Sequence, residues 1–315
     1  MKLLAEHNIY ISQSYDPHIN LSIENWLFRS HPLFNPILFL WRNSPSVIIG
    51  RAQNPWLECD MEALKKNNIP LVRRQSGGGT VYHDLGNLNY TFICPKENYN
   101  KIKNLHIIIS ALKSLNIEAN RTQRNDIVVE HNSIMYKVSG CAFRESKDRA
   151  FHHGTLLINA DTKKLTNFLH HTQDSNINAK GVSSVRSHVI NLGDINHNYE
   201  IENYENAIID SFIEQNRGTS KEIKTINPIH LNIRQIKDES IELKSWEWTF
   251  GKTLPFNQTL NINDKKIILT IRKGLIDSYN MTNPKQLDIK LLHTILKNKP
   301  AYSSKVITRI QEVLS

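Results

Sequence analysis

The chain is most informative at Arg73-Arg74-Gln75-Ser76-Gly77-Gly78-Gly79-Thr80-Val81-Tyr82-His83-Asp84, where three successive glycines separate two segments that predict strands. Glycine inside regular structure costs about 0.5–1 kcal/mol relative to alanine, so such a run is typical of a turn with positive φ or of backbone against a ligand. Consecutive amide N–H groups can bind an anion such as phosphate, and the two preceding arginines can add charge-assisted bonds to phosphate or carboxylate. The alternative is a flexible hairpin turn beside an exposed basic pair.

A second informative segment is Tyr136-Lys137-Val138-Ser139-Gly140-Cys141-Ala142-Phe143, which places a lysine in an apolar strand with small residues after it. Lysine is rarely buried without a partner. An ammonium group on a flexible stem suits a carboxylate and a transferring phosphoryl group, where negative charge develops. The alternative is a lysine on an edge strand that faces water.

Two more segments carry polar groups that could act with these. Asn125-Asp126 precedes a predicted strand; its carboxylate could bind Mg²⁺ beside a phosphate site, or the pair could form an Asx turn. Residues 144–155 predict a charged loop that could close over a bound nucleotide. Within that loop, His152 and His153 do not predict a metal site, because neighbours on a strand point to opposite faces and no further ligands have suitable spacing.

The composition indicates a soluble globular protein, since 39% of the 315 residues are hydrophobic and 22% are charged. No apolar run approaches the roughly 20 residues that cross a bilayer, and the N-terminus lacks the apolar core of a secretory signal. The three cysteines are far apart without a CxxC pair, which indicates free thiols in a reducing compartment. We therefore expect a cytoplasmic protein that does not associate with membranes.

Hydrophobic periodicity predicts an α+β fold. Predicted strands cover residues 9–12, 37–41, 46–50, 70–74, 88–93, 127–130, 134–139 and 154–158, and predicted helices cover 19–29, 61–67, 100–115, 163–169 and 203–214. The strands at 37–41 and 46–50 are expected to pair around an Asn-Ser-Pro turn. The sequence pattern changes at Trp246. After it we expect strands at 267–272 and 275–279 and a pair of helices. We therefore expect a large mixed-sheet domain over residues 1–250 and a small α+β domain over residues 251–315.

The net charge of +9 and the pI of about 9.3 favour acidic partners. A basic nucleic-acid-binding protein is one such interpretation, and it predicts salt-sensitive binding to DNA or RNA. No recognised nucleic-acid motif is present. The glycine run also matches neither GxGxxG nor GxxxxGKS/T, so the common nucleotide-binding folds are not indicated. We therefore do not expect a nucleic-acid partner.

Several motifs in order resemble the lipoate–protein ligase A family of the biotin/lipoate-ligase superfamily, over about Ser14 to Gly251. The matching segments are Asn43, Ile49-Gly50-Arg51-Ala52-Gln53-Asn54-Pro55-Trp56, Arg73–Gly79, His83–Asn87, Asn125-Asp126, Lys137–Ala142, Phe143–Ala160, Gly181–Ser187 and Trp246–Gly251. The resemblance implies a large mixed-sheet catalytic domain and a small C-terminal accessory domain, as in bacterial lipoate–protein ligases. It is closer to the lipoate branch than to biotin ligases, since no N-terminal helix-turn-helix is present.

The resemblance also implies a two-step reaction with ATP and Mg²⁺. The carboxylate of lipoate or octanoate attacks the α-phosphate of ATP, pyrophosphate leaves, and an acceptor lysine then attacks the acyl-adenylate. Lys137 would be the catalytic residue, bridging the lipoate carboxylate and the α-phosphate.

The resemblance assigns binding residues to each substrate. ATP and the adenylate would contact Arg74, Gly77, Gly78, Gly79, Thr80, Val81, Tyr82, Asp126 and Lys137, with Asp126 also a magnesium ligand. Lipoate would contact Leu21, Trp41, Arg74, Ser76, Gly78, His83, Lys137, Ala142 and His153.

The implied acceptors are the lipoyl domains of 2-oxoacid dehydrogenase complexes and the glycine-cleavage H protein. These domains are typically acidic, which matches the positive net charge. We expect the enzyme to be a monomer. The nearest alternative is a transferase that uses preformed lipoyl- or octanoyl-adenylate without efficient activation.

Overall fold

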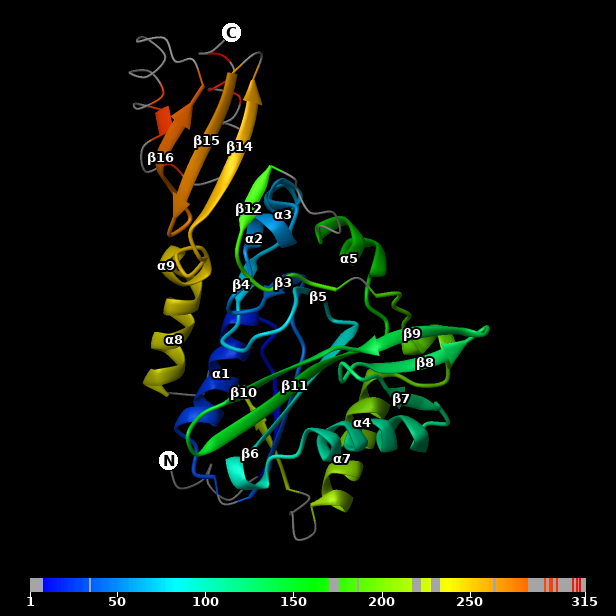
Figure 1. The fold of residues 1–315 in the computed structure, drawn as a ribbon. Coiled ribbons are helices and arrows are strands. Elements are labelled where there is room, and N and C mark those ends of the chain that lie inside the picture. Colours follow the sequence, from blue (N-terminus) through cyan, green and yellow to red (C-terminus); the bar gives the residue numbers. More distant parts are fainter. Residues whose placement is uncertain are drawn as a thin grey trace.

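A computed structural model describes residues 8–33, 35–169, 176–185, 187–216, 222–227, 233–262 and 265–282, together with Leu292, Ile295, Leu296, Lys299, Thr308, Ile310 and Glu312. The described strands form one six-stranded sheet, one four-stranded sheet and two three-stranded sheets (Figure 1). Helices cover the large sheet, and the four-stranded sheet lies at the other end of the molecule (Figure 1). The expected α+β fold is confirmed.

The large sheet is mixed. Its strands, in spatial order, are β10 (Cys141–Glu145), β11 (Arg149–Leu157), β6 (Asn87–Pro95), β2 (Ile37–Trp41), β1 (Ile9–Ser12) and β13 (Ile223–Ile226). The strand β1 is parallel to β2 and β13, whereas the other pairs are antiparallel. All five residues of β2 are buried, as expected for a strand covered on both faces.

Four helices supply that cover. On one face, α4 (Lys101–Ser114) and α7 (Ile201–Gln215) pack against Leu38 and Leu40 of β2. On the other face, α1 (Pro17–Arg29) and α8 (Arg234–Lys244) pack against Ile37, Phe39 and Trp41 of β2, which alternate with Leu38 and Leu40. The helix α1 begins where the Asp16 carboxylate accepts the His18 and Ile19 amides.

One three-stranded sheet carries the glycine turn. Its strands are β4 (Leu71–Arg73), β3 (Ser46–Ile49) and β5 (Val81–His83). The prediction that residues 37–41 and 46–50 pair is therefore wrong, since β2 pairs with β1 and β6. The linker between them bonds elsewhere: the Asn20 side chain donates to the Arg42 carbonyl and the Ser44 amide to the Tyr15 carbonyl.

The other three-stranded sheet consists of β7 (Ala119–Arg121), β8 (Ile127–His131) and β9 (Ile134–Ser139). Asn132 and Ser133 both have positive φ, 52° and 62°, which closes a two-residue hairpin with the twist of the strands. The prediction of two strands joined by a polar turn is confirmed.

The predicted loop at residues 144–155 is wrong, because these residues belong mostly to the hairpin of β10 and β11. The charged residues of this segment lie mainly at the turn of the hairpin. The apolar residues that alternate with polar ones belong to the two strands. As expected for neighbours on a strand, His152 packs against Tyr90 and Phe92, whereas His153 bonds to Glu24. Among the described residues, no group of three or more His, Cys, Asp and Glu side chains could hold a metal ion.

The four-stranded sheet is antiparallel and consists of β12 (Ile177–Ala179), β14 (Phe256–Ile262), β15 (Lys265–Arg272) and β16 (Leu275–Met281). The predicted strands at 267–272 and 275–279 are confirmed, while the predicted C-terminal helices lie largely outside the described residues. The edge strand β12 comes from within the first 250 residues. The chain thus contributes one strand to the small sheet before the last elements of the large domain. The domain boundary at 250/251 stays a prediction.

Shorter helices connect these sheets. They are α2 (Pro55–Glu58), α3 (Met61–Lys66), η2 (Lys96–Asn98), α5 (Thr162–Phe168), α6 (Leu192–Ile195) and α9 (Trp246–Thr249). Asn54, Asp60 and Asp161 cap three of them with side-chain oxygens that accept backbone amides. None of the helices in the described part of the chain is both long and apolar enough to cross a bilayer.

Candidate active site

Two cavities meet at Lys137. The Trp41 cavity, of about 300 Å³, extends between α1, β2 and β3, and the Tyr82 cavity, of about 350 Å³, extends toward α5. Both are lined by Thr80, Val81, Lys137, Gly140, Thr155, Ser183, Ser184, Val185 and Ser187. Lys137 therefore lies where a ligand in one cavity would reach a ligand in the other.

The Trp41 cavity is apolar at its far end, where Leu21, Trp41 and Ile48 line it. His83 also lines it, and burial beside the Arg74 guanidinium lowers the pKa of His83 to about 3. The imidazole is therefore neutral at physiological pH, and Asn43 lies within hydrogen-bond distance of its Nδ1 atom, at 3.1 Å. A neutral wall of this kind suits an alkyl chain rather than a charged group.

Lys137 is held by its neighbours on three sides. Its Nζ atom lies 2.8 Å from Asp126 Oδ1, and both side chains are about three-quarters buried. Its backbone N–H donates to the His188 carbonyl, and its carbonyl accepts the Ile190 amide. The β8–β9 ladder shifts register between Ile127 and Val128, beside Lys137, and such bulges redirect side chains. The sequence predicted both Lys137 and Asp126, and the structure brings them together.

Gly140 gives the lysine its space. A Cβ atom at this position would lie 2.9 Å from Lys137 Cε and 3.0 Å from Lys137 Nζ. The ammonium group can therefore lie over this residue only because it is glycine.

We predict that Gly140→Ala displaces the flexible lysine side chain without unfolding the protein. Misplacing a reacting group by about 1 Å can cost up to roughly 100-fold in rate, and we expect a loss on that order. The measurement is the rate of the reaction that the site catalyses, together with the melting temperature. A variant with normal activity would show that the position of the Lys137 ammonium does not matter.

Arg74 builds the glycine turn. Its guanidinium donates to the carbonyls of Gly77 and Gly79, both at 2.7 Å, and to the Ile48 carbonyl, while its Nε atom donates to Ser76 Oγ. Burial lowers the pKa of Arg74 only to about 10, so it stays charged. The C=O and N–H groups of a trans peptide point in opposite directions. The N–H groups of Gly78 and Thr80, which share peptides with these two carbonyls, therefore face away from Arg74. Gly78 itself has φ +85°, which glycine adopts without strain.

Arg73 is not available to a ligand. It is fully buried, and its guanidinium donates to the carbonyls of Gly50, Arg51, Gln53 and Thr249 and to the Thr253 hydroxyl. The prediction that both arginines could bind phosphate or carboxylate is therefore wrong for Arg73. Arg73 is the last residue of β4 and Arg74 follows it directly, and of the two only Arg74 lines the Trp41 cavity.

A series of hydrogen-bonded, buried polar side chains lies beside the Trp41 cavity. His153 lies 2.8 Å from Ser76 Oγ through Nε2 and 2.8 Å from Glu24 Oε1 through Nδ1. Thr91 also donates to Glu24, whose side chain is almost fully buried. This series fixes the turn against the large sheet. Glu24 was not predicted from the sequence, although a carboxylate between Leu21 and Leu27 on the buried side of α1 was a visible signal.

A titratable carboxyl lies on the outer side of the turn. Gln75 donates to Glu239 Oε1, and burial raises the pKa of Glu239 to about 7 from 4.5. The folded state therefore binds this proton more tightly than the unfolded state does. The contribution of Glu239 to the free energy of unfolding is present at low pH and is lost as the pH rises from about 4.5 toward 7.

We predict that Glu239→Gln removes this pH dependence, because glutamine keeps the acceptor for Gln75 and carries no charge. The variant should gain melting temperature relative to the natural protein at pH 8 and gain less at pH 5. Thermal unfolding of both proteins at the two pH values is the measurement. Parallel pH profiles would contradict the assignment.

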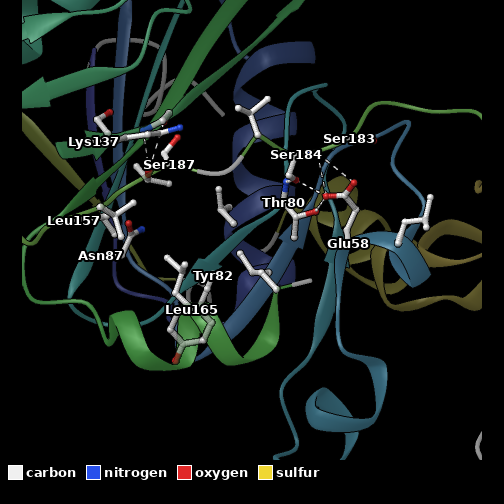
Figure 2. Close-up of a pocket in the computed structure, with 18 residues that line it drawn as sticks. Glu58, Thr80, Tyr82, Asn87, Lys137, Leu157, Leu165, Ser183, Ser184 and Ser187 are labelled. Carbon is white, nitrogen blue, oxygen red and sulfur yellow. Dashed lines mark hydrogen bonds between the residues drawn. The ribbon is translucent and has the colours of Figure 1, made fainter. Parts of the chain in front are cut away.

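The Tyr82 cavity combines an apolar wall with polar groups. Tyr82, Leu157 and Leu165 supply the apolar side, and Asn87 supplies polar atoms (Figure 2). Ser139 also lines this cavity. A flat aromatic ligand with a polar edge, such as a nucleotide base, fits such a lining.

The described residues that outline the two cavities include most of the predicted site residues. These are Leu21, Trp41, Arg74, Gly79, Thr80, Val81, Tyr82, His83, Asp126, Lys137, Ala142 and His153. Ser76, Gly77 and Gly78 line neither cavity, and their roles as ligand contacts stay predictions. Four further lining residues were not predicted from the sequence: Glu58, Ser183, Ser184 and Ser187. The last three belong to the segment Gly181–Ser187, which resembles the family.

Asp126 offers limited support for a resident metal ion. Its Oδ1 atom already pairs with Lys137, and Mg²⁺ commonly binds one or two carboxylates together with substrate phosphates. The donor set therefore fits an ion that arrives with a nucleotide as part of the substrate. Asp126 as a magnesium ligand stays a prediction.

Residues 16–213 match the lipoyl protein ligase A/B catalytic domain. Among solved structures, LipL1 of P. falciparum, in complex with lipoate, is 32% identical with a TM-score of 0.66, covering 96% of this chain and 93% of that one. A bipartite lipoate protein ligase of Thermoplasma acidophilum, described with its E2 lipoyl domain, is 24% identical with a TM-score of 0.65, covering 79% and 98%.

A lipoate-protein ligase A bound with ATP is 24% identical with a TM-score of 0.60, covering 77% of this chain and 98% of that one. The two likenesses at 24% identity show the fold alone. The family match and the P. falciparum protein show more, because they span most of the chain at significant similarity. The chain therefore belongs to the lipoyl protein ligase A/B catalytic domain family, whose enzymes attach lipoyl or octanoyl groups to proteins.

Proposed function

We propose that this chain is an ATP-dependent lipoate–protein ligase. It activates lipoate, or octanoate, with ATP to the acyl-adenylate and transfers the acyl group to a lysine of an acceptor domain. The observation that carries the proposal is the position of the Lys137 ammonium group at the junction of two cavities of different character. A carboxylate from one cavity and an α-phosphate from the other would share this cation.

Each substrate has a cavity with matching chemistry. The apolar Trp41 cavity suits the lipoyl chain, and the P. falciparum relative was solved in complex with lipoate. The Tyr82 cavity suits the adenosine moiety, which would bring Mg²⁺ with its phosphates.

The chain's own residues support both steps. In activation, a lipoate carboxylate oxygen bonds to the α-phosphorus while the bond to pyrophosphate breaks. In transfer, the acceptor amine bonds to the acyl carbon and AMP leaves. Negative charge builds on oxygens at the junction in both steps, and the Lys137 ammonium stabilises it. Asp126 holds the ammonium in place before substrate arrives.

The proposed acceptors are lipoyl domains of 2-oxoacid dehydrogenase complexes and the glycine-cleavage H protein. The net charge of +9 would attract acidic domains. The T. acidophilum relative was described with an E2 lipoyl domain, which makes such a domain the first acceptor to test. We further propose that residues 1–250 form the catalytic domain and residues 251–315 an accessory domain for activation.

Intact-mass spectrometry of an apo lipoyl domain tests the function. After incubation with enzyme, ATP, Mg²⁺ and lipoate or octanoate, we expect one acyl group on one lysine and release of pyrophosphate. A domain that is modified only when synthetic lipoyl-AMP replaces ATP and lipoate would overturn the ligase in favour of a transferase. No modification in either assay would overturn both.

A further inference from the structure

We propose that the Nε2–H group of His83 makes the Trp41 cavity prefer an acyl chain that ends in a dithiolane ring over one that ends in carbon alone. A sulfur atom of the ring accepts a hydrogen bond from this group, whereas an alkyl chain offers no acceptor. This inference rests on the proposed function, because it names the feature that selects lipoate over octanoate at the same site.

The Asn20 side-chain amide, on α1, has only one possible orientation. Its Nδ2 atom lies 2.9 Å from the Ser14 carbonyl oxygen and 2.8 Å from the Arg42 carbonyl oxygen. Carbonyl oxygens only accept hydrogen bonds, so the atom that faces both of them is the amide nitrogen. The Ser12 hydroxyl donates to the amide oxygen at 2.6 Å.

This orientation fixes the side chain of Asn43 and, through it, the proton of His83. The Asn43 atom that lies 2.9 Å from the Asn20 nitrogen must be an acceptor, because two N–H donors would repel, and it is therefore Oδ1. The Asn43 nitrogen then lies 3.1 Å from Nδ1 of His83 and donates to it. Burial lowers the pKa of His83 to about 3, so the ring carries a single proton. That proton is on Nε2.

The Nε2–H group of His83 is a buried donor that has no acceptor among the described residues. His83 is 3% exposed and lines the Trp41 cavity. Its Nδ1 atom faces Asn43, which does not line this cavity as the described residues outline it, so the opposite ring edge is the one available to a ligand. His153 also lines the cavity, but its two nitrogens bond to Ser76 and Glu24. A buried donor without a partner is costly, which favours a ligand that brings an acceptor.

This donor lies where the end of an acyl chain would be. The His83 ring contacts Trp41 at the far end of the cavity, with 6.0 Å between the ring centroids. A chain whose carboxylate bonds to Lys137 would extend toward this end. Leu21 and Ile48 offer apolar contacts to any chain, whereas a sulfur atom is a weak acceptor and a methylene group is none. A site with a buried donor therefore discriminates against the ligand that lacks the acceptor.

Calorimetric binding to the purified full-length protein tests this inference with two matched probes. They are lipoate and the analogue in which a cyclopentane ring replaces the dithiolane ring, which keeps the shape and removes the sulfur. We expect the natural protein to bind lipoate more tightly, and octanoate should resemble the analogue. His83→Leu should lower the ratio of the two dissociation constants by roughly threefold to tenfold, the range for one hydrogen bond of modest strength.

His152→Leu is the matched control. This histidine is also fully buried, and neither of its nitrogens has a partner among the described residues, but it lines neither cavity as they outline it. The control should keep the ratio of the natural protein, and equal ratios in His83→Leu and His152→Leu would overturn the inference. His83→Phe, which keeps an aromatic ring beside Trp41, is the second variant if His83→Leu does not fold.

Nitrogen NMR of the natural protein, labelled at histidine, is an independent check that needs no variant to retain activity. A neutral His83 ring with its proton on Nδ1 would overturn the inference. The binding assay contains no ATP, so lipoate binding without adenylate formation would contradict the ligase function and leave this inference intact. A protein that bound neither lipoate nor octanoate would overturn both.

Discussion

Replacing Lys137 with alanine is expected to lower the rate of adenylate formation by roughly 10²–10³-fold. The side chain supplies the cation at the point where the two cavities meet. Its removal takes away the cation that the attacking carboxylate and the phosphoryl oxygens would share at this point. It also leaves Asp126 without the partner at 2.8 Å, so a carboxylate would face the incoming phosphates.

Lipoate-dependent release of pyrophosphate is the measurement for Lys137→Ala. The loss should appear mainly in kcat, because the charge that Lys137 stabilises is greatest in the transition state. Lys147→Ala is the control, since Lys147 is exposed at the turn of the β10–β11 hairpin. A pyrophosphate release rate equal to that of the control would remove Lys137 from the mechanism.

The double variant Lys137→Ala, Asp126→Asn separates two parts of this effect. If part of the loss comes from the unpaired Asp126 carboxylate, the asparagine should recover some of the rate. Asp126→Asn alone should cost less than Lys137→Ala, because the ammonium remains. The comparison forms a double-mutant cycle on a pair in direct contact.

Replacing Arg73 with methionine is expected to lower the free energy of unfolding by on the order of 3–5 kcal/mol. The variant would leave buried carbonyls of Gly50, Gln53 and Thr249 without their charged donor. A single lost hydrogen bond to a charged group costs about 1.5–3 kcal/mol, and several are lost here. Methionine keeps much of the side-chain volume, so the effect reports the hydrogen bonds more than a cavity.

Chemical denaturation of Arg73→Met measures this loss. The matched control is Arg121→Met on β7, where the arginine is exposed and the change should be small. Remaining activity should follow the fraction of folded protein, because Arg73 does not line either cavity as the described residues outline them. A stability equal to that of the control would show that water replaces the lost donors.

Arg73 and Arg74 show what a local sequence pattern can predict and what it cannot. The sequence predicted both on a strand before a glycine turn. The structure has this strand, but it ends at Arg73 and Arg74 follows it. The sequence pattern did not separate a structural arginine from one that lines a cavity. That difference arises because Arg73 meets Thr249, which is 176 positions away.

The sequence also predicted Lys137 and Asp126, and it missed Glu58 and its contact with Ser184. Lys137 was visible because a charge within an apolar strand breaks a local pattern. Glu58 is the last residue of an ordinary short helix, and nothing near it in the chain marks a partner 126 positions away.

Helices, strands, the glycine turn and the lysine motif could be read from residues a few positions apart, because backbone propensity, side-chain alternation and glycine conformation act over that range. The pairing of β3 with β4 and β5, the meeting of two cavities at the Lys137 ammonium group and the contact between Glu58 and Ser184 emerged only in the folded chain. Each depends on hydrogen bonds between residues that are distant in sequence, and these form only when burial in the core brings their elements together.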